Sequence, residues 1–110
     1  MDTPGHVNSW GFNEQTKDII ITCPPNPTYF NSQLDGQLDP TMDKSYDIVG
    51  GVLKDVQAMF PDEYVHMGGD EVFGNCWDQR PSIKEFMAAN NIADYNALQV
   101  YYRNRLSPAI

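Results

Sequence analysis

Apolar residues recur every three or four positions in the middle of this chain, and that spacing predicts a helix. The pattern covers residues 46–60 and stops before Pro61. Asp39 is a candidate N-cap, and Pro40 fits the first helical position because that position needs no backbone N–H donor. Gly50-Gly51 interrupts the helix at a cost of roughly 1 kcal/mol for each glycine, so we expect another part of the chain to pack close to them.

Short apolar runs predict strands. One run covers residues 18–22 around three consecutive isoleucines, and another covers residues 64–67 before a double glycine. Two more helices are predicted, over about residues 81–90 and from Asp94 to about residue 106. Helices that alternate with short strands are typical of parallel α/β architectures. One good strand makes no sheet, however, so the sequence predicts an excerpt of a larger α/β domain with no internal boundary.

The first 40 residues are rich in proline, glycine, asparagine and aspartate, which predicts long loops with at most the one strand at residues 18–22. Compact domains rarely hold so much irregular chain unless the loops carry function or rest on other parts of the protein. Cys23 and Cys76 are the only cysteines. Their number alone leaves open both a disulfide and two separate buried thiols.

Composition places the chain among globular proteins and argues against two classes of partner. Hydrophobic residues make up 41% and charged residues 20%. The net charge of −8 repels phosphate backbones and anionic lipids, so we expect neither nucleic-acid binding nor docking on an anionic membrane. No apolar run approaches the ~20 residues of a membrane span, and the N-terminal sequence lacks the features of a signal peptide.

The most informative stretch is His66-Met67-Gly68-Gly69-Asp70-Glu71-Val72, which begins in a predicted strand and continues past its end. In a barrel of parallel strands, catalytic residues gather at the carboxyl ends of the strands. Two glycines allow a sharp backbone turn and the close approach of a bulky ligand. Asp70 and Glu71 need such a turn to face one ligand, because neighbouring residues of a regular strand point to opposite sides.

Paired carboxylates at this place suit acid–base chemistry. Each carboxylate disfavours charge on the other, so one of a pair can keep its proton and serve as a general acid. The other stays ionised and can stabilise a developing positive charge. A solvated acidic loop is the alternative interpretation, and the residues by themselves leave it open.

A second group with chemical potential is Asp2-Thr3-Pro4-Gly5-His6. His6 in a Pro-Gly turn could tune a carboxylic acid through a hydrogen bond, whereas the alternative is an ordinary surface histidine. His66, inside the predicted strand, is expected to be a core histidine with its hydrogen bonds satisfied. These two histidines and the Asp70-Glu71 pair also offer metal ligands, but their spacing matches no known ligand pattern, so we expect no metal or cofactor.

The motifs occur in an order that resembles one known family. The series is Asp2-Thr3-Pro4-Gly5-His6, Ser9-Trp10-Gly11, Asn26-Pro27-Thr28, Phe60-Pro61-Asp62, His66-Met67-Gly68-Gly69-Asp70-Glu71-Val72 and Cys76-Trp77. It resembles the β-N-acetylhexosaminidases of glycoside hydrolase family 20 over nearly the whole chain, most closely over residues 2–11 and 60–87. Residues 13–23 fit the family pattern poorly.

The resemblance implies an α/β fold, the (β/α)8 TIM barrel. This chain, residues 1–110, would be a fragment of one catalytic domain. It would run from about the end of the third strand, through the fourth strand at residues 64–67, to about the fourth helix. The arginine, the further aspartate and the tryptophans with which the family holds its sugar would lie outside it, so we expect little activity from the fragment alone.

The resemblance also implies a reaction, which is the hydrolysis of terminal β-linked N-acetylglucosamine or N-acetylgalactosamine in glycans and glycoconjugates. In the family, the acetamido group of the sugar attacks the anomeric carbon and configuration is retained. Glu71 falls on the general acid, which later acts as a base on water, and Asp70 falls on the residue that orients the acetamido group. His6 falls on the histidine beside the acid. Asp2 and His66 would support the site.

Cys23 and Cys76 match cysteines that pair in the animal lysosomal enzymes, so the resemblance implies a disulfide and a lysosomal or secreted location. Two alternatives remain, a non-catalytic sugar-binding or inactive-subunit piece of the same fold and a metal-dependent hydrolase. The choice between the two amino sugars, the natural glycan and the oligomeric state, including a dimer of the full-length protein, stay open.

Overall fold

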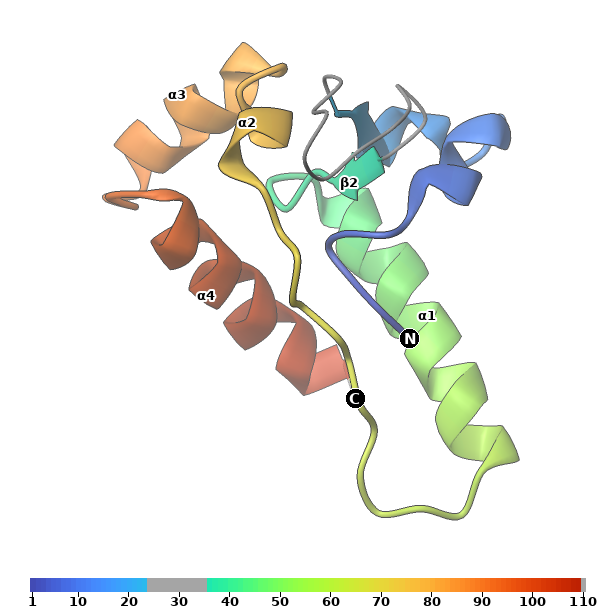
Figure 1. Ribbon diagram of the computed structural model, residues 1–110. Helices are drawn as coiled ribbons and strands as arrows, with labels where there is room; N and C mark the ends of the chain where they lie inside the picture. Colours follow the sequence, from blue (N-terminus) through green and yellow to red (C-terminus); the bar gives the residue numbers. More distant parts are fainter. Residues whose placement is uncertain (24–35, 110) are drawn as a thin grey trace.

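Helices and one short sheet make up the described part of the chain (Figure 1). The computed structural model describes residues 1–23 and 36–109, so the motif at residues 26–28 lies outside it. The elements are the 3-10 helices η1 (Asn8–Phe12), η2 (Lys17–Ile19) and η3 (Ser107–Ala109), the strands β1 (Ile20–Thr22) and β2 (Gly36–Leu38), and the helices α1 (Asp43–Met59), α2 (Gly74–Trp77), α3 (Pro81–Ala89) and α4 (Tyr95–Leu106). Within these described ranges, no helix combines the length and the apolar character needed to cross a membrane.

The sheet is an antiparallel pair rather than the parallel arrangement that the sequence predicted. β1 and β2 pair with Ile20 opposite Leu38 and Thr22 opposite Gly36. The strand predicted at residues 18–22 is confirmed over its last three residues, while η2 takes up its start. β2 was not predicted, because its three residues lie among turn-forming glycine, aspartate and proline.

Residues 64–67 do not form the predicted strand. They belong to an extended segment that runs between α1 and α4 (Figure 1). A strand exists only where a neighbour supplies a ladder of hydrogen bonds. In the described part of the chain the neighbours supply two bonds. The N–H of Thr3 donates to the Met67 carbonyl at 3.3 Å, and the amino group of Met1 donates to the His66 carbonyl at 3.5 Å.

α1 begins at Asp43, later than the predicted start, because the side chain of Asp39 serves another purpose. Its carboxylate accepts hydrogen bonds from the N–H of Thr41 at 2.9 Å and from the hydroxyl of Thr41 at 2.7 Å. It also pairs with Arg80 at 2.9 Å, with the carboxylate almost fully buried. Asp39 thus fixes a turn before the helix, and the residue at the N-cap is Met42, which makes no side-chain capping bond.

The other two predicted helices are confirmed as α3 and α4. The carboxylate of Asp94 accepts from the N–H of Ala97 at 2.8 Å and so caps α4 at the predicted place. The glycine pair in α1 fits its prediction only in part. Gly50 is buried, but a Cβ added to Gly51 would meet no atom within 4 Å, so the expected close packing is wrong there.

Two apolar clusters hold the elements together, with β1 between them. Ile20 enters the first cluster and Ile21 the second, as the alternation of side chains along a strand requires. The first cluster joins α1 and α4 through Tyr46, Val49, Leu53, Tyr102 and Leu106, and the second joins α2, α3 and α4 through Trp77, Ile83, Met87 and Leu98. Met67 packs on the first cluster and Val72 on the second, so the chain that carries Asp70 and Glu71 bridges the two.

Candidate active site

The N-terminal motif and the loop at Glu71 meet in space. His6 Nε2 lies 3.6 Å from Glu71 Oε1 and 3.9 Å from Asp2 Oδ2. Asp2 Oδ1 accepts a hydrogen bond of 2.9 Å from the backbone N–H of Gly69. The side chains of His6 and Glu71 are 50% and 64% exposed, so both can reach a ligand from solvent. The structure therefore brings Asp2, His6 and Glu71 to one place.

His6 and Glu71 both have a left-handed backbone. Their φ angles are 56° and 53°, in a region that costs a residue with a Cβ roughly 1 kcal/mol or more. Such conformations persist where the surroundings hold them. Here Gly5 packs on the Glu71 backbone so closely that a Cβ on Gly5 would lie 3.3 Å from the Glu71 carbonyl oxygen. The chain thus turns at Glu71 itself.

Gly68 and Gly69 also have positive φ angles, 66° and 103°. A Cβ on Gly68 would collide with Asp2, and one on Gly69 would collide with Arg103. We expected a ligand to come close to these glycines, but in the structure side chains of the protein itself occupy that space. The glycines are therefore needed for the loop to pack, whatever the loop binds.

Two residues of α4 hold this loop and were not predicted from the sequence. Gln99 donates a hydrogen bond from Nε2 to the Gly69 carbonyl, and Arg103 donates from Nη2 to the Gly68 carbonyl. Their spacing of four residues puts both on one face of the helix. That spacing was a visible signal, but it does not tell which carbonyl groups the side chains meet.

Asp70 and His66 do not join the group formed by Asp2, His6 and Glu71. Asp70 is exposed, and its carboxylate makes no hydrogen bond or ion pair with the described residues. His66 is exposed rather than buried in the core, because the strand expected to bury it does not form. Its Nδ1 accepts a hydrogen bond of 3.0 Å from the N–H of Gly68, so it supports the loop from the solvent side.

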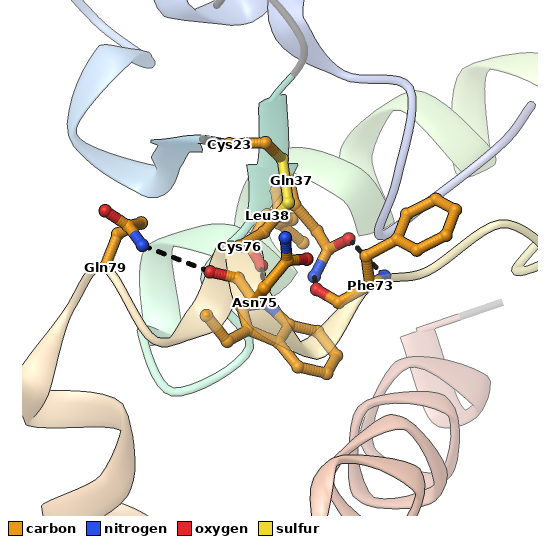
Figure 2. Close-up of a disulfide and its surroundings, with 8 residues drawn as sticks. Cys23, Gln37, Leu38, Phe73, Asn75, Cys76 and Gln79 are labelled. Carbon is orange, nitrogen blue, oxygen red and sulfur yellow. Dashed lines mark hydrogen bonds between the residues drawn. A yellow bond between two sulfur atoms is a disulfide. The ribbon is translucent and has the colours of Figure 1, made fainter. Parts of the chain in front are cut away.

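The chain that follows Glu71 is tied to the sheet. The implied disulfide between Cys23 and Cys76 is confirmed, and it joins the end of β1 to α2 (Figure 2). Trp77, which is fully buried, donates a hydrogen bond of 2.9 Å from Nε1 to the Leu38 carbonyl of β2. These links fix the position of α2 against both strands.

A buried hydrogen bond ties the N-terminal motif to α4. The hydroxyl of Tyr102 donates to Thr3 Oγ1 at 2.6 Å. Burial raises the pKa of Tyr102 to about 12, so this hydroxyl keeps its proton at any physiological pH. Asp2 is the neighbour of Thr3, and α4 therefore positions Asp2 as well as the two glycines.

A small hollow lies beside Glu71. Its volume is about 30 Å³, and its lining includes His6, Gly36, Gln37 and Glu71. Pockets for small molecules usually measure roughly 300–1,000 Å³, so this hollow is about a tenth of the smallest of them. In the described part of the chain, no cluster of three or more histidine, cysteine, aspartate or glutamate residues is placed to hold a metal ion.

The sequence matches, over residues 1–110, the profile of the glycosyl hydrolase family 20 catalytic domain. The chain belongs to this family. The resemblance stated from the motifs is thereby confirmed. The catalytic domain of family 20 is a TIM barrel, which agrees with the expected fold class at the level of the family.

Curated relatives cover nearly all of this family 20 chain. It is 34% identical to a beta-hexosaminidase subunit beta of Mus musculus over 107 residues, which are 96% of this chain and 19% of the relative. The human subunit beta is 34% identical over 103 residues, 93% of this chain and 18% of the relative. Subunit alpha of Rattus norvegicus is 36% identical over 105 residues, 93% of this chain and 19% of the relative. The chain thus spans about a fifth of the length of these relatives.

Proposed function

We propose that this chain carries the proton donor of a β-N-acetylhexosaminidase. The whole protein would remove terminal β-linked N-acetylglucosamine or N-acetylgalactosamine from glycans and glycoconjugates. The relatives named beta-hexosaminidase support the substrate class. The observation that carries the proposal is the position of His6 Nε2, which lies 3.9 Å from the Asp2 carboxylate and 3.6 Å from the Glu71 carboxylate.

Glu71 acts twice in the proposed reaction. It first donates its proton to the glycosidic oxygen while the bond to the anomeric carbon breaks. The resulting carboxylate then takes a proton from the water that attacks the anomeric carbon in the second step. His6 orients the Glu71 carboxyl group through Nε2, and Asp2, whose carboxylate faces the same nitrogen, helps to hold the imidazole in place. The 3.6 Å separation suits this role, because hydrogen bonds of catalytic groups often shorten only when the substrate binds.

Asp70 binds and orients the acetamido group of the sugar. The oxygen of this group attacks the anomeric carbon and forms a bicyclic intermediate with positive charge on its nitrogen. The Asp70 carboxylate accepts the N–H of the group, turns its oxygen toward the anomeric carbon and stabilises the charge. The exposure of Asp70 beside Glu71 supports this assignment. The water that opens the intermediate arrives on the face that the leaving group left, so configuration is retained.

Residues 1–110 form one part of a single barrel domain in this proposal, from about the end of the third strand to about the fourth helix. The hollow beside Glu71 supports this view, because a volume of about 30 Å³ is far too small for a sugar ring. Three exposed apolar side chains near the end of α1, Met59, Phe60 and Tyr64, also support additional protein that covers them. The isolated 110 residues are expected to have little activity.

The disulfide supports an oxidising compartment, which we take to be the lysosome or the exterior of the cell. Disulfides are rare in the reducing cytosol, where thiols are kept free. The Cys23–Cys76 bond joins segments on the two sides of Glu71 in sequence. An oxidising compartment would therefore preserve the bond that holds these two segments together.

The test is a rate measurement on the full-length protein with phenyl and nitrophenyl N-acetyl-β-glucosaminides and galactosaminides. Glu71→Gln should lower kcat for the phenyl glycosides by roughly 100-fold or more, because their leaving oxygen needs a proton. Asp70→Asn should slow substrates that carry the acetamido group. The matched control is Glu85→Gln, on the exposed face of α3, which should keep the parent rate. Normal turnover by Glu71→Gln, or fast turnover by the isolated 110 residues, would overturn the proposal.

A further inference from the structure

Gln37 of β2 makes a reciprocal pair of hydrogen bonds with the backbone of Phe73 (Figure 2). Its Nε2 donates to the Phe73 carbonyl at 3.1 Å, and its Oε1 accepts from the Phe73 N–H at 3.1 Å. The side-chain amide thus pairs with Phe73 as a neighbouring strand would. Gln37 is only 1% exposed, so the two bonds are shielded from competing water.

Phe73 lies two residues beyond Glu71, and the chain before Glu71 is held as well. There the N–H of Gly69 donates to Asp2, and Gln99 donates to the Gly69 carbonyl. Glu71 is therefore the midpoint of a short bridge that is fixed at Gly69 and at Phe73. A shift of either anchor moves the Glu71 carboxyl group. Gln37 and Glu71 also line the same hollow, so β2 lies beside the bridge.

The disulfide and the Trp77 bond are more distant ties. Cys76 and Trp77 follow Glu71 by five and six residues, and the side chains of both tie α2 to the two strands. Phe73 precedes α2 and has an extended backbone, with a φ of −120° and a ψ of 122°. The Phe73 carbonyl also accepts a hydrogen bond of 3.1 Å from the N–H of Cys76 in α2, so α2 and Gln37 share that group. The Phe73 N–H points the other way along the chain and donates to Gln37, which adds a constraint on the side of Phe73 nearer Glu71.

We propose that Gln37 is a positioning residue for Glu71. Its amide fixes the backbone at Phe73 and thereby sets where the Glu71 carboxyl group meets the leaving oxygen of the substrate. The inference rests on the proposed function, because it assumes that Glu71 is the proton donor. It goes beyond that function by assigning a role to β2, which touches no reacting atom.

The test compares two substrates in the full-length protein with Gln37→Met, which removes both hydrogen bonds but keeps the length of the side chain. One substrate is the phenyl N-acetylglucosaminide, whose leaving oxygen needs a proton, and the other is the 3,4-dinitrophenyl analogue, which leaves with little protonation. We expect kcat/KM for the phenyl substrate to fall roughly 10- to 100-fold and kcat/KM for the dinitrophenyl substrate to fall less than about 3-fold. The ratio kcat/KM is the right measure because it reports the steps up to departure of the leaving group and leaves out the second step, in which Glu71 acts as a base on both substrates. A variant that is merely less stable lowers both rates equally, because the rate ratio does not depend on the amount of folded enzyme.

Two further variants make the outcome decisive. Gln79→Met is the matched control, since Gln79 also donates its amide to a backbone carbonyl, that of Asn75 at 3.3 Å, but lies exposed beyond the bridge (Figure 2). It should keep the parent ratio. Gln37→Asn is shorter by one methylene and should shift the ratio of the phenyl to the dinitrophenyl rate in the same direction as Gln37→Met. It replaces Gln37→Met in the test if that variant does not fold. An unchanged ratio in the folded Gln37 variants overturns the positioning role.

Glu71→Gln, assayed on the same two substrates, separates this inference from the proposed function. If Glu71→Gln slows the phenyl substrate far more than the dinitrophenyl one while the Gln37 variants do not, the proposed function stands and the role of Gln37 fails. If Glu71→Gln lowers kcat/KM equally for both substrates, the proton donor is misassigned and the inference fails with it.

Discussion

His6 and Glu71 face each other across 3.6 Å, and each adopts a left-handed backbone that residues with a Cβ rarely occupy. Two costly conformations therefore meet at one point of the molecule. Strain of this kind is concentrated at active sites, where the surrounding structure maintains it. It also limits which substitutions give a clean answer, because a β-branched residue at either position would disturb the backbone along with the chemistry.

We expect His6→Asn to lower kcat on phenyl N-acetylglucosaminides by about 10-fold or more, because the partner that orients Glu71 is lost. Asparagine tolerates the left-handed region better than most residues, so the backbone at φ 56° is kept. The measurement is kcat at saturating substrate, with circular dichroism as a check on folding. A parent-like rate would show that the imidazole does not assist Glu71.

Gly69→Ala should destabilise the protein by more than about 1 kcal/mol, because the new Cβ collides with Arg103 at a φ that disfavours alanine. Gly51→Ala is the matched control in α1, where the added Cβ meets open space. It should stabilise the protein by up to about 1 kcal/mol through higher helix propensity. Denaturant unfolding of both variants measures the two changes. Equal changes in the free energy of unfolding for the two variants would show that Gly69 does not pack against Arg103 as described.

Replacement of Cys23 and Cys76 by serine should lower the free energy of unfolding by about 2–5 kcal/mol, since the bond closes a long loop of the unfolded chain. Dithiothreitol should bring the parent protein to the stability of the double variant and leave the variant unchanged. Urea unfolding with and without reductant provides the measurement. If the reductant destabilised both proteins alike, its effect would not come from this disulfide.

Alkaline pH should weaken the fold through its buried tyrosines. Burial raises the pKa of Tyr102 to about 12 and also raises the pKa of Tyr46. In the unfolded chain these tyrosines lose their protons near pH ~10. The stability that the protonated, buried tyrosines give to the fold is therefore complete below that pH and is lost as pH rises through about 12. The free energy of unfolding should stay level to about pH 10 and then fall, by about 2–3 kcal/mol for Tyr102. Tyr102→Phe should show a smaller fall over the same range.

The helices were the most predictable part of the fold, because their signals are local. Asp94 caps α4 at the predicted place, and the apolar spacing over residues 81–90 became α3. The start of α1 was predicted too early because Asp39, a good N-cap by type, is drawn to Arg80, which follows it by 41 residues. The strand predicted at residues 18–22 was confirmed over its last three residues, but the one at residues 64–67 was wrong and β2 was missed. Pairing partners such as Leu38 for Ile20 cannot be read from either segment alone.

The motifs allowed the sequence to single out Asp2, His6, His66, Asp70 and Glu71. Asp2, His6 and Glu71 lie together, whereas Asp70 and His66 do not join them. What the sequence could not supply was the set of side chains that hold them. Gln37, Gln99 and Arg103 each bind backbone groups of the Glu71 loop or its flanks. A polar residue on a strand or helix face gives no sign of which distant carbonyl it will meet. Positioning residues are therefore found from contacts, whereas reacting groups can be recognised by chemical type.

The hydrogen bond from Tyr102 to Thr3 joins residues 99 positions apart. At the usual pace of roughly 5–20 residues per second, a ribosome needs roughly 5–20 seconds to make the chain between them. During that interval Thr3 has been made while its partner does not yet exist. Assembly around Glu71 must therefore wait until translation has passed α4, and a nascent chain halted before that helix would have no means of completing it.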